Sequence, residues 1–247
     1  MKNTPQLDKI IGSSPIYPNT FDIHYSSGVC AFPSHGYLSI ININLHQRFD
    51  VQIAQNLRNI SALKFSSNEN QLAVGELGTN SKIIVLTFNN SFDQVISKLS
   101  IDTKENGFSC LAFDSKKGRL ISVGADLQPF LILWDLNHPN PIKLGYYHLS
   151  VQPNKVIFNS DCSLAVVAGE GVLKLIQTNF SYENKPILMK SRRANFDTYT
   201  DSDFVDIYCT KGIPFNLYAL CYEGKLCFYQ EIDNPFLKHQ KSKKASL

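Results

Sequence analysis

Short hydrophobic runs alternate with polar turns along the chain, and three stretches repeat these features in the same order. Each stretch opens with an apolar run that ends in a phenylalanine, at Phe65, Phe113 and Phe158. A polar turn follows, then a strand of small apolar residues, then a strand rich in β-branched residues. The phenylalanines lie about 48 and then about 45 residues apart, the length of one β-propeller blade with slightly long loops. The pattern therefore predicts an all-β fold built from repeated four-stranded sheets.

The second and third strands of each repeat refine this prediction. Small residues in the second strand would let neighbouring sheets approach closely, and in the middle repeat Trp134 and Asp135 form the WD dipeptide that ends the third strand. We expect both residues to be structural, and we expect Trp134→Ala to cost about 3–5 kcal/mol if the ring is buried between blades. The repeats together predict a WD40-type β-propeller. The small second-strand residues are Ala73, Gly75, Ser122, Gly124, Ala165 and Ala168.

Two weaker copies flank the three clear repeats, one near each end, so the count is about five blades. Such a ring could close or stay open, and the sequence favours neither outcome. We expect fourth strands in the polar segments 93–101, 142–150 and 186–191. The polar segment Ser191 to Asp203 is expected to be a long loop that either bridges two blades or contacts a partner.

The domain boundaries follow from the same pattern. Residues 1–17 are predicted to be an N-terminal extension, residues 18–232 the propeller, and residues 233–247 a basic, disordered tail. The tail holds four lysines, Lys238, Lys241, Lys243 and Lys244.

Composition narrows the function classes. Hydrophobic residues make up 43% of the chain, charged residues only 18%, and the net charge is +3, so no nucleic-acid partner is indicated. No apolar stretch approaches the roughly 18 residues that would span a bilayer, and the N-terminus lacks the apolar run of a signal peptide. The six cysteines show no metal-ligand spacing and are expected to be buried, reduced thiols of a cytoplasmic protein.

Catalytic motifs are missing from the sequence. There is no glycine-rich phosphate loop, no GxSxG nucleophile elbow and no HExxH zinc motif. The histidines occur singly in separate repeats. We therefore predict no catalytic residue, no cofactor and no metal site, and an enzyme with a site in the central channel remains a remote alternative. Four carboxylates are expected to accept hydrogen bonds from backbone amides in blade turns, Asp126, Asp135, Asp161 and Asp206.

The serial order of motifs resembles one group of WD-repeat proteins. GVCAFPSHGYLSIIN, ISALKFSSNENQLAVGELG, CLAFDSKKGRLISVGADLQPFLILWDL, LAVVAGEGVLKLIQ and LCYEGKLCFYQE follow one another. This order is similar to the N-terminal propeller of the scaffold family that includes the mitogen-activated-protein-kinase-binding WD protein and its spindle-pole relative. The resemblance covers about Ser14 to Glu231. It implies a cytoskeletal, centrosomal or kinase-signalling setting. Those scaffolds also carry a second propeller and C-terminal docking and dimerising segments that this sequence does not show, so we expect either a divergent short relative or the start of a longer product.

The leading hypothesis is a non-catalytic interaction scaffold or adaptor that binds other proteins through loops at one end of its blades. We expect it to be cytoplasmic, in a cytoskeleton-associated location at the centrosome or cilium, and to belong to a larger multiprotein assembly. The alternative is a ciliary or flagellar microtubule-associated protein. The candidate contact residues are Glu76, Asn80, Asp126, Gln128 and Glu170.

Overall fold

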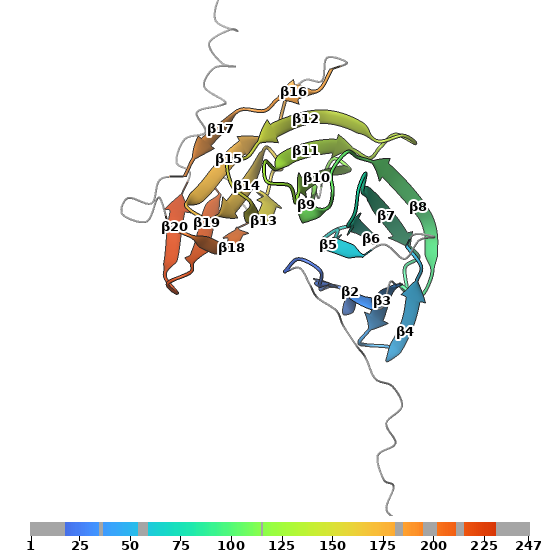
Figure 1. Ribbon diagram of the computed structural model, residues 1–247. Helices are drawn as coiled ribbons and strands as arrows, with labels where there is room; N and C mark the ends of the chain where they lie inside the picture. Colours follow the sequence, from blue (N-terminus) through green and yellow to red (C-terminus); the bar gives the residue numbers. More distant parts are fainter. Residues whose placement is uncertain are drawn as a thin grey trace, which may run out of the picture.

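Five antiparallel sheets follow one another around an arc in the computed structural model of the chain (Figure 1). The structure describes residues 18–34, 37–53, 59–114, 116–180, 185–194, 202–210 and 215–230. All regular elements of these residues are strands. In each sheet the strand nearest the centre of the arc comes first in sequence, and the later strands lie progressively further out.

The strands group into five blades in sequence order. Blade 1 contains β1 (Asp22–His24), β2 (Val29–Ser34), β3 (Tyr37–Asn42) and β4 (Gln47–Val51). Blade 2 contains β5 (Ile60–Phe65), β6 (Gln71–Glu76), β7 (Lys82–Phe88) and β8 (Val95–Asp102). Blade 3 contains β9 (Phe108–Asp114), β10 (Arg119–Gly124), β11 (Phe130–Asp135), β12 (Ile142–His148) and β16 (Ile187–Leu188). Blade 4 contains β13 (Pro153–Phe158), β14 (Leu164–Gly169), β15 (Val172–Gln177) and β17 (Ser191–Arg193). Blade 5 contains β18 (Phe204–Cys209), β19 (Asn216–Cys221) and β20 (Leu226–Gln230).

The prediction of a WD40-type β-propeller with five recognisable blades is confirmed. The first and last sheets do not pair with each other among the described residues, so the arc is open rather than a closed ring (Figure 1). The predicted extension 1–17 and tail 233–247 lie outside the described residues.

A polar residue after each anchor phenylalanine turns the inner strand back into the second strand. Ser66 follows Phe65, and its hydroxyl accepts a hydrogen bond from the amide of Glu69 at 3.3 Å. Asp114 accepts the amide of Lys116 at 2.8 Å, and Asn159 accepts the amide of Leu164 at 2.9 Å. A short oxygen-bearing side chain can satisfy turn amides in this way, which explains why three different residues occupy the equivalent position.

A hydrophobic core lies between each pair of neighbouring blades, and the small second-strand residues lie within or beside these cores. Ala73, Ala165 and Ala168 are fully buried. A methyl group placed on Gly75 would come within 2.7 Å of the Phe108 ring of the next blade. The sheets therefore approach closely because these positions lack bulk, as the sequence predicts.

Trp134 lies in the core between blades 2 and 3, with Ile83 and Val85 of blade 2 in the same cluster. Its indole nitrogen donates a hydrogen bond to the Ser122 hydroxyl at 2.9 Å. Asp135, at the end of β11, accepts the backbone amide of Asn137 at 2.9 Å and so caps the turn that follows. Within the WD dipeptide, Trp134 thus stabilises the packing of two sheets, whereas Asp135 caps a turn.

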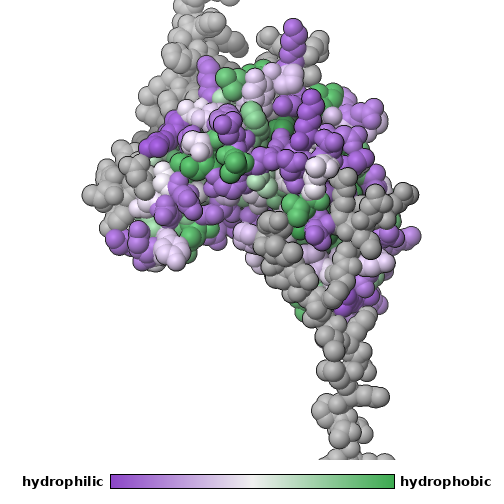
Figure 2. Space-filling view, in the orientation of Figure 1, coloured by the Kyte–Doolittle hydropathy of each residue, from purple (hydrophilic) through white to green (hydrophobic). Residues whose placement is uncertain are grey.

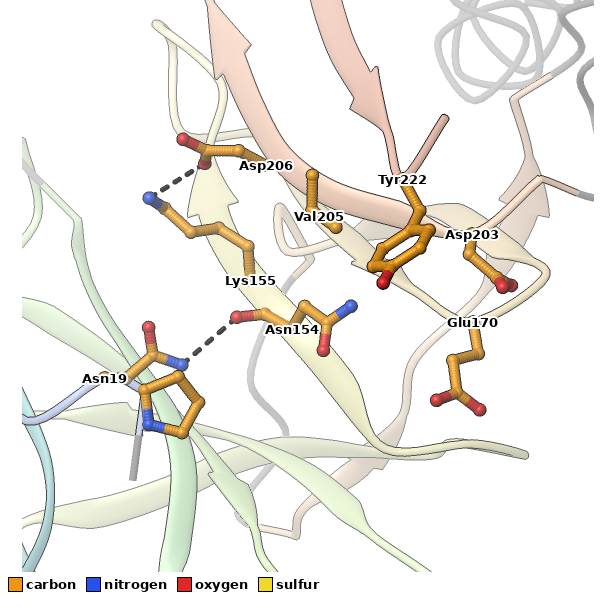
Figure 3. Close-up of a pocket in the computed structure, with 9 residues that line it drawn as sticks. Asn19, Asn154, Lys155, Glu170, Asp203, Val205, Asp206 and Tyr222 are labelled. Atoms are coloured by element: carbon orange, nitrogen blue, oxygen red, sulfur yellow. Dashed lines mark hydrogen bonds and ion pairs between the residues drawn. The ribbon is translucent and has the colours of Figure 1, made fainter. Parts of the chain in front are cut away.

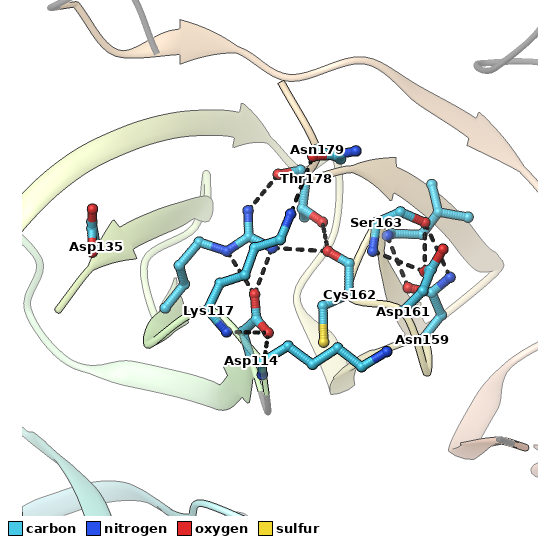
Figure 4. Close-up of polar contacts among 12 residues, drawn as sticks. Asp114, Lys117, Asp135, Asn159, Asp161, Cys162, Ser163, Thr178 and Asn179 are labelled. Atoms are coloured by element: carbon cyan, nitrogen blue, oxygen red, sulfur yellow. Dashed lines mark hydrogen bonds and ion pairs between the residues drawn. The ribbon is translucent and has the colours of Figure 1, made fainter. Parts of the chain in front are cut away.

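The arginine of a buried ion pair in blade 3 links this blade to blade 4 by hydrogen bonds (Figure 4). The Arg119 guanidinium contacts the Asp114 carboxylate through its Nε atom at 2.6 Å. It also donates to the carbonyl oxygens of Thr178 at 2.7 Å and Cys162 at 2.8 Å, both in blade 4. A buried charge is tolerated only when it is paired and fully hydrogen-bonded, so the position of Arg119 depends on both blades.

Two sequence expectations for the outer strands are wrong. The segment 186–191 does not form one fourth strand: Ile187 and Leu188 pair in parallel with β12 of blade 3. The fourth strand of blade 4 is instead Ser191–Arg193, which pairs with β15 and occupies the start of the expected long loop. Residues 195–201 of that loop lie outside the described residues. Arg192 donates to the Tyr229 hydroxyl of blade 5 at 2.7 Å, a tertiary contact that favours the strand.

The cysteines agree with their sequence prediction in most respects. All six are free thiols, and five are buried, while Cys209 is partly buried. Burial raises the pKa of Cys110 and of Cys209 to about 12. These thiols therefore stay protonated and unreactive near neutral pH.

Candidate functional site

A hollow of about 790 Å³ opens at the centre of the arc beside blades 4 and 5 (Figure 3). The face of the molecule seen in Figure 2 is largely hydrophilic, with scattered hydrophobic residues. We call this feature the axial hollow. It is lined by Pro18, Asn19, Asn154, Lys155, Glu170, Asp203, Val205, Asp206 and Tyr222.

Asn19 forms one wall of the axial hollow and connects three blades. Its carbonyl oxygen accepts the amide of Leu63 in blade 2 at 2.7 Å. Its side-chain amide donates to the carbonyl oxygen of Ser109 in blade 3 at 2.7 Å and to that of Asn154 in blade 4 at 3.1 Å. The chain segment before β1 therefore crosses the inner strands near the centre of the arc and fixes one side of the hollow.

Two further contacts hold the opposite wall in place. The Asn154 side chain donates to the carbonyl oxygen of Phe204 at 2.9 Å and so ties the inner strands of blades 4 and 5 together. The Asp203 carboxylate accepts the amide of Gly171 at 2.9 Å, which fixes the β14–β15 turn that presents Glu170. The lining side chains thus come from rigid inner strands and from short, hydrogen-bonded turns.

The lining charges are mainly acidic. Glu170, Asp203 and Asp206 supply three carboxylates, while Lys155 is the one cationic side chain among the lining residues that the structure describes, and it pairs with Asp206 at 2.9 Å. Glu170 and Asp203 therefore leave an excess of negative charge, and both are exposed. Tyr222 stands beside them and is 80% exposed. An exposed aromatic ring next to carboxylates can hold a cationic side chain by charge attraction and a cation–π contact.

The predicted contact residues occupy equivalent turns of three consecutive blades. Glu76 and Asn80 flank the β6–β7 turn, Asp126 and Gln128 lie in the β10–β11 turn, and Glu170 lies in the β14–β15 turn. Of these, only Glu170 lines the axial hollow. Glu76 is 3% exposed and accepts the amide of Lys82 at 3.2 Å. Their role in partner binding stays a prediction.

Sequence reasoning missed most of the axial hollow. Asp203 is the last residue of the expected loop. No motif or spacing in the sequence marks Asn19, Lys155 or Tyr222 as site residues. Asp206 accepts a backbone amide as expected, that of Ile207 at 2.8 Å, but it lies inside β18 rather than in a turn, and its carboxylate also pairs with Lys155. The expectation for Asp161 fits, because this carboxylate accepts the amide of Ser163 at 3.0 Å.

A second acidic pair lies in blade 3, outside the axial hollow. Burial, helped by a hydrogen bond and a charge interaction with Asp126, raises the pKa of Glu105 to about 7, while the Lys143 charge opposes the shift. A hydrogen bond from the Asn106 side chain to Asp126, at 2.8 Å, lowers the pKa of Asp126. Near neutral pH, Glu105 can therefore hold a proton that it shares with the Asp126 carboxylate.

The described residues offer no group of three or more His, Cys, Asp or Glu side chains placed to hold a metal ion. Within the same part of the chain, no helix is long and apolar enough to cross a membrane.

The fold and the axial hollow together define the class: the chain is an open WD40-type β-propeller. No protein-family profile and no curated protein matches its sequence. A chain from the crystal structure of the mitotic checkpoint complex is similar in fold, with a TM-score of 0.65 and 13% sequence identity. The match covers 93% of this chain and 70% of that chain. In all, 757 chains of solved structures match, so the fold is common and does not by itself assign a function.

Proposed function

We propose that this propeller is a non-catalytic protein-interaction module that binds a basic peptide segment of a partner at the axial hollow. The observation that supports this most is the lining itself, in which Glu170 and Asp203 are unbalanced carboxylates beside the exposed ring of Tyr222. A lysine or arginine side chain of a peptide fits that chemistry, because it can meet a carboxylate and stack on the ring at once.

The setting belongs to the same proposal. The sequence resemblance supports a cytoskeletal, centrosomal or kinase-signalling assembly, and the structural neighbour from the mitotic checkpoint complex is a component of a multiprotein complex. Affinity purification of the tagged chain from its own cells would test this setting. Recovery of centrosomal or kinase-cascade proteins at constant ratio supports it, whereas axonemal proteins would favour the ciliary alternative.

The peptide proposal is tested by fluorescence anisotropy with a labelled lysine- and arginine-rich peptide and a peptide of the same length in which glutamine replaces each basic residue. We expect the basic peptide to bind more tightly and to weaken as salt rises, since salt screens exposed charges. Glu170→Gln should weaken binding by roughly threefold to tenfold, in line with the loss of one charge-assisted contact.

The matched control is Glu69→Gln, which removes an exposed carboxylate from the β5–β6 turn. This variant should bind like the wild type. Equal binding of the basic and neutral peptides, or equal loss in Glu170→Gln and Glu69→Gln, would overturn the assignment of the axial hollow.

A further inference from the structure

Three polar side chains meet at the outer rim of the molecule, between blades 3 and 4. Tyr147 comes from β12 of blade 3, whereas Lys174 comes from β15 and Ser191 from β17 of blade 4. The Ser191 hydroxyl donates a hydrogen bond to the Tyr147 hydroxyl oxygen at 2.7 Å, and the Lys174 ammonium donates to the same oxygen at 3.3 Å. We call these three residues the Tyr147 cluster. It shares no residue with the lining of the axial hollow.

The backbone on both sides of the cluster fixes the positions of the two donors. In the β15–β17 register, Ser191 lies opposite Ile176, which is buried in the core shared with blade 3. Lys174 is two residues from Ile176 along β15, so its side chain leaves the sheet on the same side. The amide of Met189 donates to the carbonyl oxygen of Tyr146 at 2.9 Å and holds the chain before Ser191 against β12. Strand pairing therefore directs both donors toward Tyr147.

These donors stabilise the negatively charged form of the Tyr147 side chain. The Lys174 ammonium lies 5.3 Å from the centre of the Tyr147 ring, and Arg193, opposite Lys174 in the strand register, adds positive charge on the same side of the sheet. Hydrogen bonds and a nearby cation favour a phenolate over a neutral phenol. Burial raises the pKa of Tyr147, but the hydrogen bonds from Ser191 and Lys174 and the charge of Lys174 outweigh it, so this pKa lies below its ordinary value of 10.0.

Solvent reaches the Tyr147 cluster. Tyr147, Lys174 and Ser191 are each partly exposed. The thiol of Cys110 is in the opposite situation, because it is buried and its pKa is raised to about 12. An accessible hydroxyl held beside a cation is better placed to react as a nucleophile than a buried, protonated thiol.

We propose that Tyr147 is a nucleophilic tyrosine and a site of covalent modification by electrophiles with a tetrahedral sulfur or phosphorus centre. With an aryl sulfonyl fluoride, the Tyr147 oxygen forms a bond to sulfur while the sulfur–fluorine bond breaks. Fluoride leaves with the electron pair, and the phenol proton passes to water. Lys174 and Ser191 are positioning residues, since they stabilise the charge on the attacking oxygen. The attached group lies where β17 of blade 4 meets blade 3, so modification acts on the joint between these blades.

Labelling of the full chain with a limiting amount of an aryl sulfonyl fluoride tests the proposal. Peptide mapping by mass spectrometry measures the label on each tyrosine separately. At about pH 7.5, Tyr147 should react at least about fivefold faster than Tyr25 and Tyr222, although these two are 89% and 80% exposed. Tyr146 is a second internal comparison, because the Lys143 ammonium lies 4.8 Å from the centre of its ring. It should react slowly if hydrogen bonds to the hydroxyl oxygen are required.

Substitution of the donors tests the cause of the reactivity. Lys174→Met keeps much of the side-chain length but removes the charge, so it should slow the labelling of Tyr147 at least about fivefold and move its pH profile to higher pH. Ser191→Ala should have a smaller effect in the same direction. The labelling of Tyr25 should not change in either variant, which shows that the reagent is equally active.

The matched control is Lys98→Met, which removes an exposed lysine of β8 in blade 2. It should change the labelling of Tyr147 by less than about twofold, because salt screens a distant exposed charge. Labelling that follows exposure, with Tyr25 and Tyr222 first, would overturn the proposal. So would a Lys174→Met variant, folded by circular dichroism, whose rate and pH profile at Tyr147 equal those of the wild type. Failure of peptide binding at the axial hollow would not affect it, because the two experiments measure different sites.

Discussion

Glu105 shows how a single side chain can make the stability of this protein depend on pH. Its carboxyl group interacts with Asp126 and lies directly against Gly124, where no room is left for a larger side chain. The folded chain raises the pKa of Glu105 from 4.5 to about 7. The folded state therefore binds a proton that the unfolded state releases between these two pH values.

We predict that Glu105→Gln stabilises the protein at pH 8 relative to the wild type and changes little at pH 5. The stabilisation from the protonated carboxyl is complete below the unfolded pKa of 4.5 and is lost as the pH rises through about 7. A glutamine amide stays neutral throughout and can still donate toward Asp126. Urea unfolding of both proteins at the two pH values measures the difference. Parallel pH profiles for the variant and the wild type would contradict the coupling.

At the scale of the elements, each blade is held by what its neighbour supplies. Trp134 of β11 packs against residues of blade 2, while Arg119 of β10 reaches carbonyl oxygens of blade 4. Blade 3 is therefore held on its two sides by different interactions, an apolar core that contains Trp134 on one side and hydrogen bonds from the buried Arg119 on the other.

We predict that Trp134→Ala lowers the free energy of unfolding by about 3–5 kcal/mol, because it leaves a large cavity between two sheets. The Ser122 hydroxyl also loses its donor. Trp134→Phe should lose much less, since the ring still fills most of the space and only about 1 kcal/mol of hydrogen bonding is removed. Urea unfolding provides the measurement. A loss below about 1 kcal/mol for the alanine variant would contradict tight packing between the blades.

The inner strands could be predicted from sequence because their signals are local. The phenylalanine anchor, the polar turn and the small second strand repeat within each blade, and each feature has a physical role in that same blade. The outer strands were harder, because Ser191–Arg193 has no apolar alternation and is a strand only through its pairing with β15.

The axial hollow could not be predicted for a related reason. Its walls come from the N-terminal segment at Asn19, the start of β13, the β14–β15 turn and the two ends of the β18–β19 hairpin. No spacing in the sequence connects these segments, since only the curvature of the arc brings them together. The sequence did indicate Glu170 as a contact residue, because it lies in a turn equivalent to those of the other blades.

At the scale of the whole molecule, the first and last blades do not pair with each other in the described part of the chain, so the strands form an open arc. The segment before β1 adds a connection between blades that does not depend on ring closure, because Asn19 forms hydrogen bonds with blades 2, 3 and 4. It thereby links the inner strands of three consecutive blades.

We predict that Asn19→Ala lowers the free energy of unfolding by about 1–3 kcal/mol, since the carbonyl groups of Ser109 and Asn154 lose their donor. The control is Asn90→Ala, which removes an exposed amide that contacts Asn70 within the same blade. That variant should stay within about 0.5 kcal/mol of the wild type. Equal effects of the two substitutions in urea unfolding would show that Asn19 has no special role.

The reach of Asn19 also has a consequence for how the chain is made. Asn19 and Asn154 are 135 residues apart in sequence. During synthesis on the ribosome, the N-terminal segment emerges long before its partner in blade 4 has been translated. Domains generally begin to fold from the N-terminal side as the chain grows. The contact of Asn19 with Asn154 must therefore wait until blade 4 has been made, whereas Leu63 and Ser109 reach Asn19 earlier, so the segment docks onto blades 2, 3 and 4 in steps.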